Sequence, residues 1–571
     1  MASTLTRDAE TATPKTPRHG VSSTQSVLRR RLLGRPRTAK ERLWAWLGPA
    51  IVTVLGGLPR FWDLGRPHQL IFDETYYVKQ GWSVIRNGYE LRVRDTIVQG
   101  GSTFNVPGDH QGQVADSYFT NGLHPTAYGT DADLVVHPPV GKWMIGIGEN
   151  FFGINDSFGW RFAVAVVGTI AIYLVGRAAW HLFRSATLAT IASVLLAVEG
   201  MEFVHSRVGI LDIIVMFWAL AAFVAILADR DYARKRLADK VAGMRDAGTF
   251  IGSNRLGGPR LGWRPWRWVA GICLGLGTAT KWSDGFYLVA FGLMTVLWDL
   301  GARRAVGVRR WISATFIKDA IPAAFTMVGL TIVTYLFTWT GWFRADNSYQ
   351  RHWAATHPAN QDNGISPDSS LFGWLPDSMR SLWQYHVEMY NSAANITSFH
   401  EYMSNPWSWM VQARPTSYFY ESPKRGQQGC DVDSCSKAIT SLGNVSIWWV
   451  ATVALFVLLF FWLLRRDWRA GAILGGIAAG WLPWFMYQER TIFTFYAVTF
   501  APYVVLAVVY ICGLVLGKET DSAERRRVGR LVVGGYVSLA VAFFVFWWPL
   551  YTAQVIPYRQ WQLHMWFPSW I

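Results

Sequence analysis

The chain alternates between long apolar runs and short polar stretches. Runs of about 20 mostly apolar residues are long enough to cross a bilayer as helices, and the sequence contains eleven of them. They lie near residues 44–63, 158–180, 186–205, 208–228, 266–281, 283–300, 320–340, 446–464, 471–487, 493–516 and 530–550. The pattern predicts an all-α polytopic membrane protein with about 11 transmembrane helices.

The polar segments between these runs differ greatly in length. Two of them, 64–157 and 341–445, are too long to be simple connectors, and loops of this length usually carry function. Residues 1–43 are polar and contain ten Lys or Arg, which predicts a disordered basic arm. Residues 44–571 then form a single membrane domain that includes both long loops.

Composition and charge agree with this layout. Hydrophobic residues make up 51% of the chain and charged residues 16%, compared with about 25% charged residues in soluble domains. With the N-terminus inside, 35 of the 54 Lys and Arg fall on the inner side and 25 of the 38 Asp and Glu on the outer side. Because cytoplasmic loops are enriched in basic residues, we expect a cell-membrane protein with a cytoplasmic N-terminus and an extracytoplasmic C-terminus. The net charge of +16 then needs no nucleic-acid partner.

Two adjacent carboxylates stand out in the first long loop. Asp73 and Glu74 lie between the apolar residues 70–72 and 76–78. A carboxylate in such surroundings is costly unless it has a task, so we predict a catalytic role for this pair. An ordinary solvated loop is the alternative.

Further ionisable groups lie at the predicted outer ends of the apolar runs. They are Arg207, Asp212, Lys281, Asp284, Glu489 and Arg490. Charges at this depth usually serve a function or pair with one another, and snorkelling or structural ion pairs are the alternative for each. As a set, they predict a polar, cation-rich cleft beneath the two long loops.

A carboxylate pair beside several cations suits the transfer of a sugar from a lipid phosphate. Arg binds phosphate as a planar fork and Lys as a point charge. Because the sugar leaves on phosphate, a stable anion, no general acid is needed as it is in glycoside hydrolysis. One base that deprotonates the attacking hydroxyl is then sufficient.

The second long loop contains Cys430 and Cys435. Outside the cell they can close a small disulfide loop, and two free thiols are the alternative. A zinc site would need further ligands nearby, and the sequence offers none there. We therefore predict a disulfide and no metal site.

The ordered landmarks of the chain resemble those of the protein O-mannosyltransferases. They are Arg60, Phe72-Asp73-Glu74, His137-Pro138-Pro139-Val140-Gly141-Lys142, Arg161, His205-Ser206-Arg207 with Asp212, Gly275 with Lys281-Trp282, and Arg490-Thr491 with Phe493. They follow one another in the order found in that family and span most of the membrane region. The resemblance implies a GT-C membrane fold with two large extracytoplasmic loops.

The resemblance also implies a reaction and its partners. A single mannose passes from polyprenyl phosphate mannose to Ser or Thr hydroxyls of exported proteins, with inversion at the anomeric carbon. No cofactor is expected beyond the lipid-linked donor, and the partners are membrane lipids, acceptor proteins and, as a candidate, the secretion translocon.

The residue roles follow from the same resemblance. Asp73 corresponds to the base and Glu74 to its neighbour, which orients the base or the acceptor peptide. The candidate residues for binding the substrate or its phosphate are Arg60, Arg161, His137, Lys142, Arg207, Asp212, Lys281 and Arg490.

One departure from the eukaryotic members is visible. They carry a β-trefoil MIR domain in the second long loop, whereas residues 341–445 show no threefold repeat, which favours the shorter bacterial type. Two other functions stay open. One is a related GT-C enzyme that modifies an envelope lipid or polysaccharide. The other is a secondary transporter, which would show repeated spans.

Overall fold

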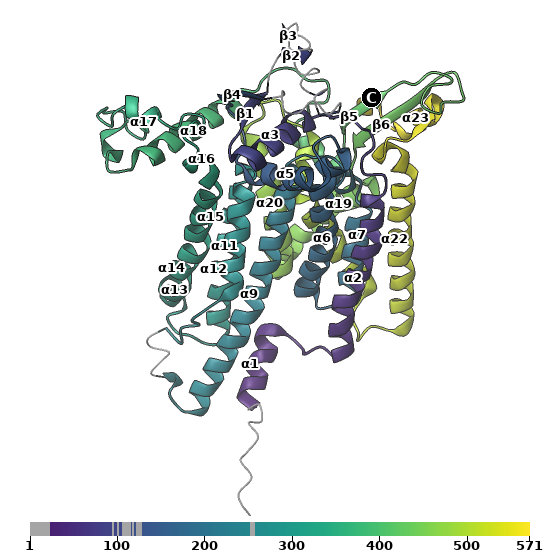
Figure 1. Cartoon of the computed structure of the whole chain (residues 1–571). Coiled ribbons are helices and arrows are strands. Elements are labelled where there is room, and N and C mark those ends of the chain that lie inside the picture. The colour runs from purple at the N-terminus through teal and green to yellow at the C-terminus, as the bar shows by residue number, and fades with distance from the viewer. Residues whose placement is uncertain are drawn as a thin grey trace, which may run out of the picture.

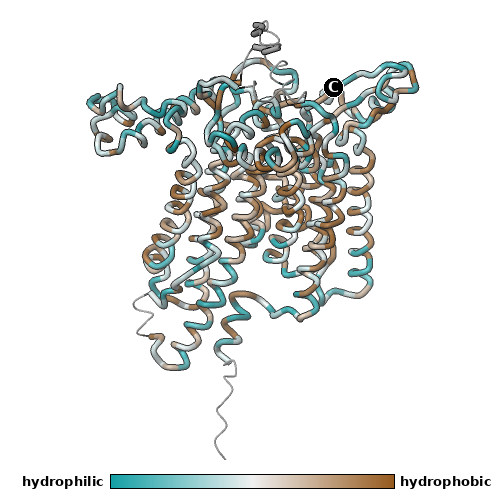
Figure 2. The backbone as a smooth tube through the Cα atoms, viewed as in Figure 1, coloured by the Kyte–Doolittle hydropathy of each residue, from teal (hydrophilic) through white to brown (hydrophobic). Residues whose placement is uncertain are grey.

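The structure, a computed structural model, is a bundle of long helices whose loops and short strands gather at one end (Figure 1). It describes residues 23–571 except 94–95, 100–101, 106–115, 117–118, 121–127 and 252–256. Figure 2 shows hydrophobic residues along the middle of the bundle and hydrophilic residues at its two ends. This distribution is the one that a multi-pass membrane protein requires.

Each of the eleven predicted runs is helical. The helices are α2 (Ala39–Phe61), α6 (Ser157–Phe183), α7 (Ala186–Ala197) with α8 (Gly200–His205), α9 (Asp212–Asp246), α11 (Pro265–Thr278), α12 (Gly285–Ala305), α13 to α15 (within Trp311–Thr338), α19 (Val445–Arg465), α20 (Trp468–Trp481), α21 (Ala501–Leu516) and α22 (Ala523–Tyr551). Within the described residues, 7 helical segments are long and apolar enough to cross a membrane by length and composition. Helix α2 is not among these seven and packs on α6 and α7, and the shorter α7, α11 and α20 pack among the longer helices.

The two long loops fold into structured elements at one end of the bundle. The first contains α3 (Glu74–Asn87), α5 (Val140–Phe152) and two antiparallel strand pairs, β1 (Leu91–Val93) with β4 (Tyr128–Ala132) and β2 (Thr96–Gln99) with β3 (Ser102–Asn105). The second contains α16 (Thr340–Arg344), α17 (Trp353–Thr356), α18 (Asp377–Ala394), β5 (Thr416–Glu421) and β6 (Cys435–Ser441). After α22, β7 (Val555–Pro557) joins β5 and β6 in a three-stranded antiparallel sheet, and α23 (Tyr558–His564) follows.

Two glycines bring α3 and α5 into close contact. A Cβ atom added to Gly146 would lie 2.3 Å from the carbonyl oxygen of Gly81, and one added to Gly81 would lie 3.1 Å from the backbone nitrogen of Gly146. Only glycine permits this approach, because a real Cβ would displace the partner backbone. The contact fixes α3, which begins directly after Asp73, against the rest of the outer end.

The described part of the basic arm, residues 23–43, is largely helical and not disordered as expected, while residues 1–22 lie outside the described residues. Helix α1 (Ser23–Leu33) packs on α9, where Leu28 and Leu32 are buried together with Leu237 and Val241. The physical reason is that α9 continues to Asp246, well beyond its predicted apolar end near residue 228. The second half of α9 is polar overall, but Leu237 and Val241 form an apolar stripe on one side of it, and α1 covers this stripe.

The disulfide between Cys430 and Cys435 is present. It closes a turn in the connection between β5 and β6, and this pairing confirms the prediction from the spacing. Cys273 and Cys512 are buried within helices and free, as their apolar surroundings indicate.

Candidate active site

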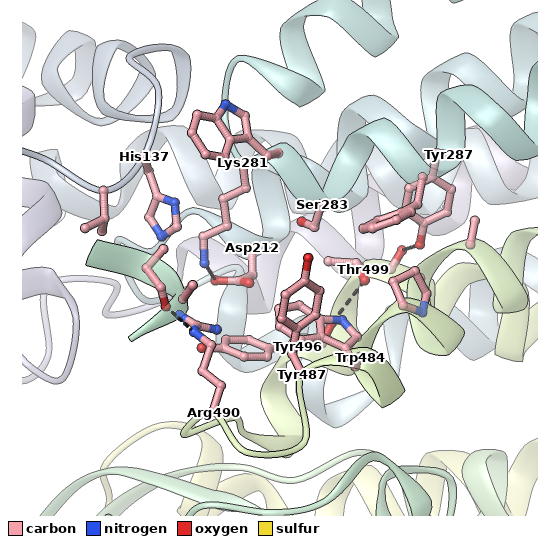
Figure 3. A pocket seen from close by; sticks show the side chains of 18 of the residues that line it. His137, Asp212, Lys281, Ser283, Tyr287, Trp484, Tyr487, Arg490, Tyr496 and Thr499 are labelled. Atoms are coloured by element: carbon pink, nitrogen blue, oxygen red, sulfur yellow. Dashed lines mark hydrogen bonds and ion pairs between the residues drawn. The ribbon is translucent and has the colours of Figure 1, made fainter. Parts of the chain in front are cut away.

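A cavity of about 240 Å³ lies near the end of the bundle that carries the long loops. Its lining includes His137, Asp212, Lys281, Arg490 and Tyr496, and Figure 3 shows these side chains converging on one space. They come from the loop before α5, the start of α9, the turn after α11, and the segment before α21. The structure thus brings together four of the residues that the sequence predicted for the substrate site.

Lys281 and Asp212 form an ion pair in the wall of this cavity. The Lys281 Nζ lies 2.7 Å from an Asp212 carboxylate oxygen and 5.6 Å from the centre of the Tyr496 ring. Asp212 is the first residue of α9, and Lys281 directly precedes the short helix η2 (Trp282–Asp284). Because an ammonium group has three donors, Lys281 keeps donors for an anion after it has bonded to Asp212.

Arg490 supplies the second cation of the cavity. Its Nε donates to the carbonyl of Ala393 at 2.6 Å. Among the residues that the structure describes, its two terminal nitrogens have no hydrogen-bond partner. A planar guanidinium with free donors is well suited to bind a phosphate group.

His137 lies in the same cavity as a neutral group. Burial is the largest cause that lowers the pKa of His137 well below its ordinary value, and the charges of Lys281, Lys142 and Arg490 lower it further. At neutral pH, His137 therefore adds hydrogen-bonding capacity to the cavity but no charge.

Asp73 lies within electrostatic range of this cavity and has no committed partner. Burial raises the pKa of Asp73 to about 6, while the charge of Lys281 lowers it and that of Asp212 raises it further. No hydrogen bond or ion pair holds its carboxylate within the described part of the chain. The preceding Phe72 adopts a positive φ of 50° and stacks on Tyr418 with ring centres 4.6 Å apart.

Glu74 is fully buried and fully engaged. Its two oxygens accept from Arg161, at 2.7 Å from Nε and 2.9 Å from Nη2. They also accept from the backbone nitrogens of Gly209 at 2.7 Å and Ile71 at 3.1 Å. Glu74 thus joins α3 to α6 and to the segment before α9, one residue after Asp73.

The side chains of Arg161 and Arg207 donate hydrogen bonds mainly to backbone carbonyls. Besides Glu74, Arg161 donates to the carbonyls of residues 64, 67 and 69. Arg207 donates to the carbonyls of residues 59, 60, 62 and 63, at the end of α2. Both side chains lie outside the cavity lining and hold the first loop, and their predicted contact with the substrate stays a prediction.

Arg60 and Lys142 are likewise buried outside the cavity lining and paired with carboxylates. Arg60 pairs with Glu202, and Lys142 pairs with Glu90. Neither cation is exposed to solvent. A buried cation is stable only when it is paired, and the predicted role of these two residues in substrate binding stays a prediction. The acceptors that satisfy these two cations come from distant parts of the chain.

Tyrosines near Asp73 were not identified from the sequence. The charge of Asp73 contributes to raising the pKa of both Tyr77 and Tyr418 well above the ordinary value, although burial is the main cause. Tyr418 bonds to His205 Nε2 at 2.9 Å and comes from β5 in the second long loop. The only signal in the sequence was the high aromatic content, which does not single out these residues.

Comparison with known proteins identifies the family. A family model described as the C-terminal four TMM region of protein-O-mannosyltransferase matches residues 378–570, and one described as dolichyl-phosphate-mannose-protein mannosyltransferase matches residues 115–242. A relative from Mycobacterium tuberculosis, named polyprenol-phosphate-mannose–protein mannosyltransferase, is 35% identical over 93% of this chain and 92% of its own length. The chain belongs to the protein O-mannosyltransferase family. A relative of the same name from Corynebacterium glutamicum is 32% identical over 91% of each chain.

The fold of a solved family member agrees with this assignment. The Saccharomyces cerevisiae protein O-mannosyltransferase Pmt1-Pmt2 complex bound to the sugar donor includes a chain that superimposes with a TM-score of 0.66. The match covers 96% of this chain and 94% of that chain at 14% identity. The predicted GT-C fold is therefore confirmed. Membership of this family makes the protein a glycosyltransferase.

The Glu74–Arg161 pair should matter more for stability than an exposed pair. We expect Arg161→Ala to lower the free energy of unfolding by about 3–5 kcal/mol, because it leaves a buried carboxylate without its partner. Arg66→Ala, which removes an exposed pair with Asp63, should cost about 0–1 kcal/mol. Thermal unfolding of the purified variants measures the difference, and equal midpoints for the two would contradict this role of Glu74.

The pKa of Asp73 predicts the pH dependence of mannose transfer. A base must be deprotonated to act, so if Asp73 has the predicted role, kcat/KM should rise with pH through about 6 and then level off. Lys281→Gln removes a charge that lowers this pKa and should move the rise to higher pH, whereas Asp212→Asn should move it to lower pH. The midpoint is read independently of each variant's maximal rate. If the pH midpoints of the two variants shift in the same direction, Asp73 is not the group that sets the pH dependence.

Proposed function

We propose that this enzyme transfers one mannose from polyprenyl phosphate mannose to Ser or Thr hydroxyls of exported proteins, with inversion. The carboxylate of Asp73 carries the proposal, because no described residue bonds to it and it lies in electrostatic range of a cavity with two cations. The bacterial relatives named polyprenol-phosphate-mannose–protein mannosyltransferase support the choice of donor. The reaction needs no cofactor other than the lipid-linked sugar.

Each proposed step has a group to perform it. Asp73 takes the proton of the acceptor hydroxyl while the hydroxyl oxygen forms a bond to the anomeric carbon. The bond between that carbon and the phosphate oxygen breaks, and polyprenyl phosphate leaves as an anion next to Lys281 and Arg490. A single displacement inverts the anomeric carbon, and a base of this kind contributes about 10²- to 10⁴-fold.

We further propose that the end with the cavity and the long loops faces the outside of the cell. The inner segments contain 35 of the 54 Lys and Arg, and this asymmetry sets orientation in membranes. The N-terminus is then cytoplasmic and the C-terminus extracytoplasmic. Acceptor proteins would reach the cavity as they emerge from the membrane during export. The secretion translocon is therefore a candidate partner of this enzyme.

Asp73→Asn should abolish transfer and leave donor binding nearly unchanged, because the amide keeps the shape of the side chain but cannot accept the proton. Turnover should fall by at least about 10²-fold. The assay incubates purified full-length protein with a Ser/Thr peptide and polyprenyl phosphate mannose and detects the mannosylated peptide by mass spectrometry. Glu489→Gln is the matched control, since Glu489 is exposed beside Arg490.

Two results of this assay would count against the proposal. If Asp73→Asn keeps more than about a tenth of the turnover, a loss under about 1.4 kcal/mol, Asp73 is not the base. If the wild-type protein modifies an envelope lipid or polysaccharide and leaves the peptide unmodified, the acceptor class is wrong.

The orientation predicts which cysteines are accessible from outside. Asn363→Cys, in the second long loop, should react with a membrane-impermeant thiol reagent in intact cells. Asp246→Cys and Glu524→Cys, at the opposite end, should react only after the membrane is permeabilised. All three positions are exposed, and the two native free cysteines are buried. The reverse labelling pattern would overturn the orientation.

A further inference from the structure

Two adjoining cavities lie at the end of the bundle opposite the candidate active site. Their volumes are about 1050 Å³ and 800 Å³, and both are bordered by α1, α6 and α9. Figure 1 shows α1 at this end, away from α3 and α5. The two cavities share residues 33–35, Arg37, His181 and Arg184 in their linings. We call them together the basic cavity.

The basic cavity has a large excess of positive charge. Its lining contains fourteen Arg or Lys and only two acidic residues, Asp231 and Asp467. Both carboxylates are already used, since Asp231 pairs with Arg184 and Asp467 with Arg469. Most of the lining cations therefore have no counter-charge from the protein within the cavity.

Two of the cations are buried and held in place by aromatic rings. Arg230 is 6% exposed and its guanidinium lies 3.3 Å from the centre of the Trp468 ring. Its Nε is buried without a hydrogen-bond partner, and its one ion pair, with Asp231, is 3.5 Å long. Arg177 lies 3.7 Å from the Trp46 ring centre and donates from its Nη1 to the carbonyl of Ala45 at 2.8 Å. A buried cation with an unused donor, such as Arg230, is costly unless an anion is bound.

Exposed cations complete the charge. Arg30, Arg35 and Arg465 line the cavity and form no salt bridge with any residue that the structure describes. Arg35 lies at the junction, in the lining of both cavities. The guanidinium groups of Arg30 and Arg35 can therefore turn toward an anion in the larger cavity, since no described residue forms a salt bridge with either of them.

One wall of the larger cavity is apolar. Leu174 and Val224 line it together with Trp46 and Trp266, whose side chains are exposed. Exposed tryptophans at the end of membrane helices are typical of the boundary between lipid headgroups and acyl chains. A ligand of this cavity thus meets cations on one side and a lipid-facing apolar surface on the other.

We propose that the basic cavity binds the headgroup of an anionic phospholipid from the membrane leaflet on that side. The lipid phosphate bonds to arginines of the larger cavity that include Arg30, Arg35 and Arg177, and the acyl chains lie along Trp46 and Trp266. Basic pockets between transmembrane helices bind acidic headgroups in this way. A soluble phosphate would use the same cations but not the apolar wall.

The test measures lipid binding to the purified full-length protein by native mass spectrometry. Phosphatidylglycerol should bind at least about tenfold more tightly than phosphatidylcholine. The double variant Arg30→Ala/Arg35→Ala should lose about tenfold in affinity for phosphatidylglycerol. The control Arg526→Ala/Arg527→Ala removes two exposed arginines of α22 that do not line the basic cavity, and it should bind like the wild type.

The other outcomes overturn the proposal. Equal losses in the control and the cavity variant would mean attraction to general surface charge, and equal binding of the two lipids would mean no charge recognition. Displacement of phosphatidylglycerol by inorganic phosphate at equal concentration would identify a soluble-anion site. Arg30 and Arg35 are exposed, so unchanged thermal unfolding of the lipid-free variant separates lost binding from lost folding. As a second variant, Arg35→Glu should weaken phosphatidylglycerol binding more than Arg35→Ala does.

Discussion

The buried ion pair between Glu74 and Arg161 holds the first long loop on the membrane helices. Arg161 joins α6 to three loop carbonyls, and Glu74 adds the backbone of Gly209 ahead of α9. A charge pair in such a position is stable only while every lone pair and donor is satisfied, which makes the geometry strict. Asp73 directly precedes Glu74 in the chain, so the ion pair also fixes the backbone position of Asp73.

The same constraint sorts the charged residues of the outer end into two groups. Arg60, Lys142 and Arg207 are bonded to carboxylates or carbonyls of other segments and hold those segments together. Asp73 and Arg490 retain unused hydrogen-bonding capacity. A partly buried charged group that lacks hydrogen-bond partners costs free energy. A substrate that supplies these partners removes this cost.

The sequence predicted the helices well because apolar length is a local property. It missed α1 and the second half of α9, because Leu28 and Leu32 are buried only through contact with residues more than 200 positions away. It selected Asp73, Lys281, Asp212 and Arg490 because charges at the membrane surface are conspicuous. The sequence could not show that Arg60 and Lys142 differ from these four residues. Glu202 pairs with Arg60 and Glu90 pairs with Lys142 only in the folded chain.

The charges around Asp73 also link donor binding to base strength. In the free enzyme, burial raises the pKa of Asp73 to about 6, and the positive charge of Lys281 holds it below the value that burial alone would give. In the proposed mechanism, a donor phosphate bound beside Lys281 places a negative charge near Asp73, which opposes the effect of Lys281 and disfavours the carboxylate. This charge raises the proton affinity of Asp73 when the acceptor hydroxyl must be deprotonated. Because an effective base has a pKa near the working pH, binding of the donor itself brings Asp73 closer to that condition.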